Sequence, residues 1–276
     1  CREGRFGKNS EPPSFLKGGK IMVALVTGAS SGIGRDMARY LAKLGYDLII
    51  TARNKANLED LKQELEKENK VKVEVIPRDL SSTEECKSLY EEVKNKYGTI
   101  DILINNAGFG LCGEFVETDL DFELSMIDTN IKALHILMKL FLKDMVEKDQ
   151  GRILNVASVA AFMPGPLMAT YYSSKSYVLR LTEAVKEELN KKKSNVKLSV
   201  LCPGPVNTNF NKVANVQFAL KGYSSEYVAK YAIDKMLKNK TIISVGWKIK
   251  ITRFLTKISP DFINAKFCYN MQRRKL

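Results

Sequence analysis

From residue 22 onwards, short apolar runs alternate with longer segments in which apolar residues recur at helical spacing. Apolar, mostly β-branched runs are typical of strands buried on both faces, and their alternation with helices predicts a parallel sheet covered on both sides. We expect strands at residues 22–27, 47–51, 72–76, 101–105, 152–157, 196–202 and 241–245. We expect helices near residues 33–44, 54–69, 82–97, 119–148, 170–193 and 224–239. With right-handed crossovers, this order predicts one α/β domain with a Rossmann-like, doubly wound parallel sheet.

Two segments flank this predicted domain, which covers residues 22–245. Residues 1–21 run through a Pro-Pro loop without an apolar segment, and we expect them to be an N-terminal extension that is disordered or non-native, preceding a start at Met22. Residues 246–276 place Trp247 and Phe254 at helical spacing among lysines and arginines, so we expect basic amphipathic helices there.

The net charge of +13 is concentrated at the ends of the chain. Residues 246–276 hold eight positive charges and one negative, and residues 1–20 hold five and two, so the middle is nearly balanced. This distribution does not predict a nucleic-acid-binding domain. The basic C-terminal segment has two interpretations: its apolar stripe packs over a substrate cleft or a subunit interface, or it makes weak, salt-sensitive contact with an anionic membrane surface.

Cysteine and histidine usage exclude several kinds of site. The five cysteines are scattered without CxxC spacing, which indicates neither a disulfide framework nor a metal site and favours a cytoplasmic location. The single histidine, His135, lies in an apolar helical stretch, where we expect a packing role. No apolar run approaches the roughly 18 residues that a membrane span requires.

The first predicted strand leads directly into a glycine-rich turn and then a helix. Glycines allow a backbone to approach a pyrophosphate closely, and the free N–H groups and dipole of a helix N-terminus favour phosphate. The turn could alternatively be a simple tight connection between a strand and a helix. The candidate cofactor-binding residues of this turn are Gly28, Ser30, Ser31, Gly32, Ile33 and Gly34.

Further motifs follow in chain order: Asn105-Asn106-Ala107-Gly108, then Ser158, then Tyr171-x-x-x-Lys175, then Pro203-Gly204. Together with the spacing Gly-x-x-x-Gly-x-Gly, they resemble the short-chain dehydrogenase/reductase family from residue 22 to about residue 245. The resemblance implies an oxidoreductase with a nicotinamide cofactor and assembly as a homodimer or homotetramer. It also implies cofactor contacts at Asn106, Ala107, Gly108, Tyr171, Lys175, Pro203, Gly204, Val206 and Thr208.

The end of the second strand reads Ile50-Thr51-Ala52-Arg53-Asn54 and carries no carboxylate. A carboxylate there would bind the 2′-hydroxyl of NAD, whereas an arginine accepts a 2′-phosphate, so Arg53 predicts NADP(H). A solvated charge at the start of a helix is the alternative for Arg53. The family resemblance implies adenine contacts at Asp79 and Leu80, although Asp79 could instead cap the helix that begins near Ser82.

Tyr171 and Lys175 are four residues apart on a predicted helix and therefore share one face. Because an isolated phenol has a pKa near 10, we expect the lysine to lower the pKa of Tyr171. The resemblance implies that Tyr171 is the general acid/base, that Lys175 holds the nicotinamide ribose, that Ser158 binds the carbonyl and that Asn130 supports a water-mediated proton relay. Tyr172 could also face Lys175, and Asn130 could be an ordinary buried helix residue.

The loops after the strands are apolar, which implies a small apolar ketone or secondary alcohol as substrate, such as a hydroxysteroid, a 3-oxoacyl chain or a diketone. The alternative is a core role for these side chains. The apolar loop residues are Phe109, Leu111, Phe162, Met163, Leu167, Met168, Phe210, Val213, Val216 and Phe218. A non-catalytic NADP(H)-sensing or scaffold protein on the same fold is the second functional hypothesis.

Overall fold

The computed structural model describes residues 21–208 and 222–273 and is built on a seven-stranded parallel sheet. The strand order reverses between β1 and β4, which makes their carboxyl ends the switch point of the sheet. The prediction of a single, doubly wound α/β domain is confirmed. The strands in spatial order are β3 (Val73–Val75), β2 (Asp47–Thr51), β1 (Val23–Thr27), β4 (Ile102–Asn105), β5 (Arg152–Val156), β6 (Lys197–Cys202) and β9 (Ile242–Ser244).

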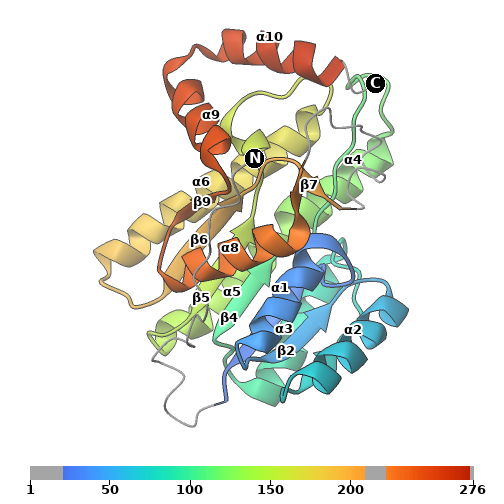
Figure 1. Cartoon of the computed structure of the whole chain (residues 1–276), viewed down its shortest axis with the longest axis vertical. Helices are drawn as coiled ribbons and strands as arrows, with labels where there is room; N and C mark the ends of the chain where they lie inside the picture. The colour runs from blue at the N-terminus through green and yellow to red at the C-terminus, as the bar shows by residue number, and fades with distance from the viewer. Residues whose placement is uncertain (1–20, 209–221, 274–276) are drawn as a thin grey trace.

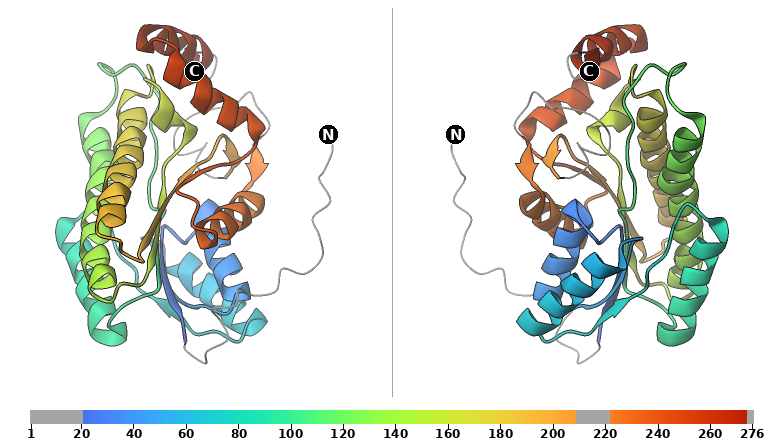
Figure 2. Two further views of the ribbon diagram at one scale, coloured as in Figure 1. Left: turned by 90° about the vertical axis from the view of Figure 1, so that its left-hand side faces the viewer. Right: turned by 90° about the vertical axis from the view of Figure 1, so that its right-hand side faces the viewer.

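Helices cover both faces of the sheet (Figures 1 and 2). One face carries α1 (Gly32–Lys43), α2 (Lys55–Glu68) and α8 (Ser225–Leu237), and the other carries α3 (Thr83–Tyr97), α5 (Leu134–Glu147) and α6 (Ala169–Lys191). The buried side chains of each group of helices pack on opposite faces of the strands and form two separate apolar clusters. The central strands are therefore buried on both sides, as the apolar runs predict, whereas the edge strand β3 is only partly buried.

The helix predicted over residues 119–148 consists of three consecutive segments. α4 (Leu120–Ile127) leads into a π-helical segment, η2 (Asp128–Ala133), which continues into α5. A π-helical segment holds one extra residue per turn, so the hydrophobic period of the sequence does not reveal it. This irregular segment contains Asn130, one of the predicted site residues.

His135 differs from its predicted packing role. Its ring is exposed on α5, and its Nδ1 atom lies 2.7 Å from the hydroxyl of Tyr177. The buried apolar residues of α5 form one face of the helix, and the histidine lies outside that face, beside Tyr177 of α6. Residues 1–20 of the N-terminal extension lie outside the described residues, as do Phe210, Val213, Val216 and Phe218.

Two short elements lie in the loops after the strands. The 3₁₀ turn η3 (Val159–Phe162) follows β5, and β7 (Val206–Asn207) pairs in parallel with β8 (Tyr223–Ser224) to form a second small sheet. After β9 the chain forms α9 (Trp247–Ile258) and α10 (Asp261–Gln272), which lie together at one end of the molecule (Figure 1).

Within the described ranges, no helix combines the length and the apolar character needed to cross a lipid bilayer.

A chain of buried hydrogen bonds ties α6 to the centre of the sheet. Asn105 of β4 donates through Nδ2 to Oδ1 of Asn155 on β5 over 2.9 Å. Asn155 donates in turn to the hydroxyl of Thr182 on α6 over 2.9 Å, and that hydroxyl donates to the carbonyl of Val178. Asn155 and Thr182 are fully buried, so each of these polar groups depends on its protein partner.

We predict that Asn155→Ala lowers the free energy of unfolding by about 1–3 kcal/mol, because it removes the partner of two buried polar groups. Urea unfolding of the purified protein measures this loss. Asn57→Ala is the control, because Asn57 is exposed on α2 and should change stability by less than about 0.5 kcal/mol. Equal losses for the two variants would contradict the structural role of Asn155.

Candidate active site

A cavity of about 1040 Å³ opens at the carboxyl ends of the parallel strands. Its walls are the loops that follow β1, β2, β3, β4, β5 and β6, together with residues of α9 and α10. Of the predicted site residues, all but Gly34 and Asn130 line it. The lining residues are Gly28, Ser30, Ser31, Gly32, Ile33, Arg53, Asp79, Leu80, Asn106, Ala107, Gly108, Ser158, Tyr171, Lys175, Pro203, Gly204, Val206 and Thr208.

The glycines of the first turn have different structural roles. Gly28 and Gly32 have φ angles of +65° and +56°, a region that side-chain-bearing residues rarely adopt. Gly34 is buried inside α1 and does not line the cavity. A Cβ atom at Gly34 would lie 2.4 Å from the carbonyl oxygen of Gly28 and 2.3 Å from Nδ2 of Asn106. Gly34 therefore permits close packing of α1 behind the turn.

The N-terminus of α1 points its backbone N–H groups at this cavity. Ser31 is the N-cap residue, but its side chain makes no capping hydrogen bond, and the first turn of the helix contains no acidic residue. The first N–H groups of a helix have no partner within the helix, and the helix dipole gives this end a partial positive charge. The turn therefore fits a phosphate group of a dinucleotide.

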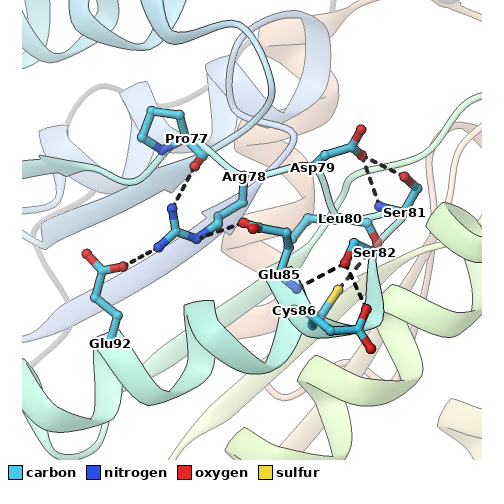
Figure 3. Close-up of polar contacts among 10 residues, drawn as sticks. Pro77, Arg78, Asp79, Leu80, Ser81, Ser82, Glu85, Cys86 and Glu92 are labelled. Atoms are coloured by element: carbon cyan, nitrogen blue, oxygen red, sulfur yellow. Dashed lines mark hydrogen bonds and ion pairs between the residues drawn. The ribbon is translucent and has the colours of Figure 1, made fainter.

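Two arginines line the cavity near the ends of β2 and β3, and only one of them is engaged by carboxylates. Arg78 contacts Glu85 at 3.2 Å and Glu92 at 2.7 Å and donates to the carbonyl of Pro77 (Figure 3). Arg53 is exposed and forms no ion pair with any described residue. Its guanidinium can therefore bind an anionic group without first leaving a protein partner.

Asp79 does not cap α3. Its Oδ1 atom accepts hydrogen bonds from the backbone N–H and the hydroxyl of Ser81, whereas Ser82 is the N-cap and accepts from the N–H of Glu85 (Figure 3). The carboxylate thus stabilises the short loop between β3 and α3. This loop holds Asp79 and the buried Leu80 against the cavity.

The turn after β1 and the loop after β4 are joined by direct hydrogen bonds. The hydroxyl of Thr27 accepts from the backbone N–H groups of Asn106 and Ala107 over 2.9 and 3.0 Å. The Asn106 side chain donates to the carbonyls of Thr27 and Gly28 over 3.0 and 3.2 Å. Together these four hydrogen bonds hold the loop 106–108 beside the glycine turn.

Tyr171, Ser158 and Lys175 meet on the opposite wall of the cavity. The Tyr171 and Ser158 side chains are joined by a hydrogen bond, and the Lys175 ammonium lies 5.7 Å from the centroid of the Tyr171 ring. The ammonium also donates to the carbonyl of Val156 at the end of β5 over 3.1 Å. α6 therefore presents the tyrosine and the lysine on one face, as their four-residue spacing predicts.

The pKa of Tyr171 differs from the expectation. Burial raises the pKa of this phenol to about 12, and the hydrogen bond to Ser158 opposes the rise. Burial also lowers the pKa of the Lys175 ammonium to about 8. The expected lowering of the Tyr171 pKa by the lysine is not found in this structure, because removal of the phenol from water dominates its pKa.

Asn130 lies behind the cavity wall and is buried. Its side chain accepts from the N–H of Phe109 over 3.0 Å and donates to the carbonyl of the same residue over 2.9 Å. It also donates to the hydroxyl of Ser174 on α6. A Cβ atom at Gly108 would lie 2.6 Å from Oδ1 of Asn130 and 3.3 Å from Nζ of Lys175, so glycine at this position lets the two side chains approach.

Tyr172 points toward the C-terminal helices. Its hydroxyl accepts a hydrogen bond from Nε2 of Gln272 on α10 over 2.5 Å, and a Cβ atom at Gly165 would lie 2.0 Å from its ring. Burial raises its pKa above the usual tyrosine range. Lys175 thus has Tyr171, and not Tyr172, as its aromatic neighbour among the described contacts.

The cavity also contains residues that no motif identified. Seven of them belong to α9 and α10, where the amphipathic pattern predicted helices but did not specify which side chains face a cleft. Phe109, Met163 and Met168 line the cavity as expected, whereas Leu111, Phe162 and Leu167 pack in the adjoining apolar clusters. The C-terminal residues that line the cavity are Lys248, Ile249, Thr252, Phe267, Asn270, Met271 and Gln272.

Comparison with known sequences agrees with these features. The family model described as short chain dehydrogenase matches residues 22–217. The ketoacyl reductase HetN of a Nostoc strain is 34% identical over 236 residues, which cover 85% of this chain and 81% of HetN. An uncharacterized oxidoreductase of Staphylococcus saprophyticus is 35% identical over 186 residues, which cover 67% of this chain and 79% of that protein.

Solved structures show the same architecture. A short-chain dehydrogenase from Sphingobium yanoikuyae, in complex with NADPH, superimposes with a TM-score of 0.77 at 26% identity, covering 87% of this chain and 97% of the other. A bulky-bulky ketone specific alcohol dehydrogenase from Comamonas testosteroni gives a TM-score of 0.73 at 25% identity, covering 87% of this chain and 95% of the other. The family match, the sheet order and the motifs that meet in one cavity lead to the same conclusion: this chain belongs to the short-chain dehydrogenase/reductase family and is an oxidoreductase.

Proposed function

We propose that this protein is an NADP(H)-dependent oxidoreductase that interconverts an apolar ketone and a secondary alcohol. The observation that carries the proposal is the position of the Tyr171 phenol. It is hydrogen-bonded to Ser158 and faces a cavity whose other wall is a glycine turn and a helix N-terminus suited to phosphate. One cavity therefore combines a proton donor with a dinucleotide cradle.

The residues of the cavity fit NADP(H). The N-terminus of α1 would hold the pyrophosphate, Arg53 the 2′-phosphate, and Asp79 and Leu80 would border the adenine. The bound nicotinamide supplies or accepts the hydride. The NADPH complex of the Sphingobium relative supports this choice, as does the absence of a carboxylate at the end of β2.

Tyr171 transfers the proton. Because its pKa is about 12, the phenol is protonated at neutral pH and can donate its proton to the carbonyl oxygen during reduction. Ser158 binds the same oxygen and orients it, and charge that develops on this oxygen is stabilised by both hydroxyl groups. Lys175 lies next to the tyrosine, and Asn130 and Lys175 are both close to Gly108. These two side chains provide the route by which the phenol recovers a proton.

The substrate end of the cavity is apolar, with Phe109, Met163, Met168, Phe267 and Met271 in its walls. This lining supports an apolar carbonyl compound, and hydroxysteroids, 3-oxoacyl chains and diketones remain the candidate classes. The Comamonas enzyme is specific for bulky-bulky ketones and HetN is a ketoacyl reductase, and both activities support the same reaction type. An NADPH-oxidation screen across these ketone classes tests the proposal. Bound NADPH without turnover of any class would instead indicate a sensing or scaffold protein.

We predict that Tyr171→Phe lowers kcat by about 10²–10⁴-fold, the usual contribution of a general acid, while the Kd for NADPH stays close to that of the unmodified protein. Steady-state kinetics and fluorescence titration with NADPH measure the two quantities. Tyr172→Phe is the matched control, because Tyr172 is bonded to Gln272 rather than to Ser158. A larger loss of kcat in the Tyr172 variant would overturn the assignment of Tyr171.

We predict that Arg53→Gln reduces kcat/KM for NADPH by a factor equivalent to about 1–3 kcal/mol and leaves kcat/KM for NADH unchanged, because only NADPH carries the 2′-phosphate. The matched control is Arg78→Gln, since Arg78 lines the same cavity but is held by Glu85 and Glu92. The control should not change the preference between the two cofactors. Equal losses with both cofactors in the Arg53 variant would show a structural role for that residue.

We predict that Lys175→Met raises the free energy of unfolding of the ligand-free protein at pH 7 by about 1–3 kcal/mol, because a buried charged amine is replaced by an apolar side chain. The folded pKa of Lys175 is lowered to about 8, below its usual value. Below pH 8 the buried ammonium is charged, and its full desolvation cost lowers the free energy of unfolding. This cost disappears as the pH rises toward 10.5.

Urea unfolding between pH 7 and pH 10.5 measures this difference, which should be largest at pH 7 and should shrink as the pH rises. Lys139→Met is the control, because Lys139 is exposed on α5 and its replacement should show no such trend. A Lys175 variant that is less stable than the parent protein at pH 7, or a gain that does not depend on pH, would contradict the prediction.

A further inference from the structure

The outward side of the two C-terminal helices is unusually apolar. α9 contains no buried residue, although half of its twelve residues are large apolar side chains. Trp247, Phe254 and Ile258 are each about two-thirds exposed, at 66%, 64% and 66%, and on α10 Phe262 is exposed at 74%. We name these four side chains the C-terminal apolar face. Exposed apolar groups of this size gathered on two adjacent helices are typical of an interaction surface.

Basic residues flank this face on the same two helices. Lys250, Lys257 and Lys266 are exposed and form no ion pair with any described residue. From residue 247 to residue 273 the chain holds six basic residues and one acidic residue, Asp261. An apolar stripe bordered by unpaired lysines is the pattern of helices that lie on anionic lipid surfaces.

The inner side of α9 and α10 is firmly attached to the domain. The Arg253 guanidinium lies 6.0 Å from the centre of the Phe162 ring, and the Ile249 side chain packs on Gly204, where a Cβ atom would lie 2.7 Å from it. On α10, Cys268 is fully buried and Gln272 donates to Tyr172. The helices therefore have a defined inner contact, and the described residues leave the apolar face exposed.

The position of the face suits contact with a flat surface. α9 and α10 form one end of the molecule, beyond the sheet and its covering helices, in all three views (Figures 1 and 2). A second copy of this chain would bring another strongly basic face against the lysines, which repel each other at close range. An anionic bilayer accepts the apolar side chains and attracts the lysines, so it satisfies both properties of the surface.

We propose that this protein docks reversibly on anionic lipid bilayers through the C-terminal apolar face and the lysines beside it. The aromatic and aliphatic side chains enter the headgroup region, and Lys250, Lys257 and Lys266 contact lipid phosphates. This docking does not depend on the proposed reaction. A protein that turns over no ketone would still bind the bilayer through this surface.

The full chain is sedimented with vesicles of phosphatidylcholine alone and of phosphatidylcholine mixed with phosphatidylglycerol, at low and high salt. We expect binding to the mixed vesicles at low salt, release as salt screens the charges, and little binding to phosphatidylcholine alone. No binding to the mixed vesicles would overturn the proposal, whatever the variants show.

Two variants locate the surface. The triple variant Lys250→Glu, Lys257→Glu, Lys266→Glu should bind at least about tenfold more weakly, because each lysine near an anionic surface adds to the affinity. The control Lys67→Glu, Lys70→Glu, Lys72→Glu changes the net charge equally on the end of α2 and on the loop that follows it, away from α9 and α10, and should lose much less. Equal losses in the two triple variants would overturn the proposal in favour of a nonspecific charge effect.

The variant Phe254→Ser, Phe262→Ser tests the apolar part, and it should also bind at least about tenfold more weakly. Thermal unfolding checks that each variant folds, which is expected because the replaced side chains are exposed. Light scattering measures the assembly state of the parent and the double variant. If the double variant dissociates a dimer or tetramer and leaves vesicle binding unchanged, the face is an interface between copies and the lipid proposal is wrong.

Discussion

Thr27, the last residue of β1, binds the two backbone N–H groups that follow β4, and Asn106 returns hydrogen bonds to the carbonyls of Thr27 and Gly28. A Cβ atom at Gly28 would lie 2.9 Å from the Cα atom of Ala107, so the two turns are in direct contact. The glycine turn borders this contact on one side. On the other side lies Gly108, which is close to Asn130 and Lys175. The relative position of the glycine turn after β1 and the Tyr171 phenol therefore depends on this junction.

The sequence predicted the sheet, its covering helices and most of the cavity wall, because these depend on residue pattern and on motifs at strand ends. It did not predict the π-helical segment at Asn130, since one extra residue in a turn leaves the apolar period almost unchanged. It misplaced His135, because an apolar helix still has one face toward water. It also gave the wrong direction for the Tyr171 pKa, because spacing reports which groups are neighbours but not how deeply they are buried.

The polar groups of the site are kept in place by other buried polar groups. Asn130 is held by the backbone of Phe109 and by Ser174, whose hydroxyl donates to the carbonyl of Tyr171 over 2.7 Å. Asn155 ties the middle of α6 to the sheet through Thr182. The face of α6 that carries Tyr171 and Lys175 thus has hydrogen-bonded supports at two levels, which limits the movement of Tyr171 relative to the glycine turn.

The cavity wall contains residues from Gly28, near the start of the described chain, to Gln272, near its end. Segments this far apart in sequence come together only when the whole sheet has formed, so no partly folded chain offers the complete wall. A molecule that binds across this wall has affinity for the native state alone and shifts the folding equilibrium toward it. At a concentration about 100 times its Kd, such a molecule would add about 2.7 kcal/mol to the free energy of unfolding.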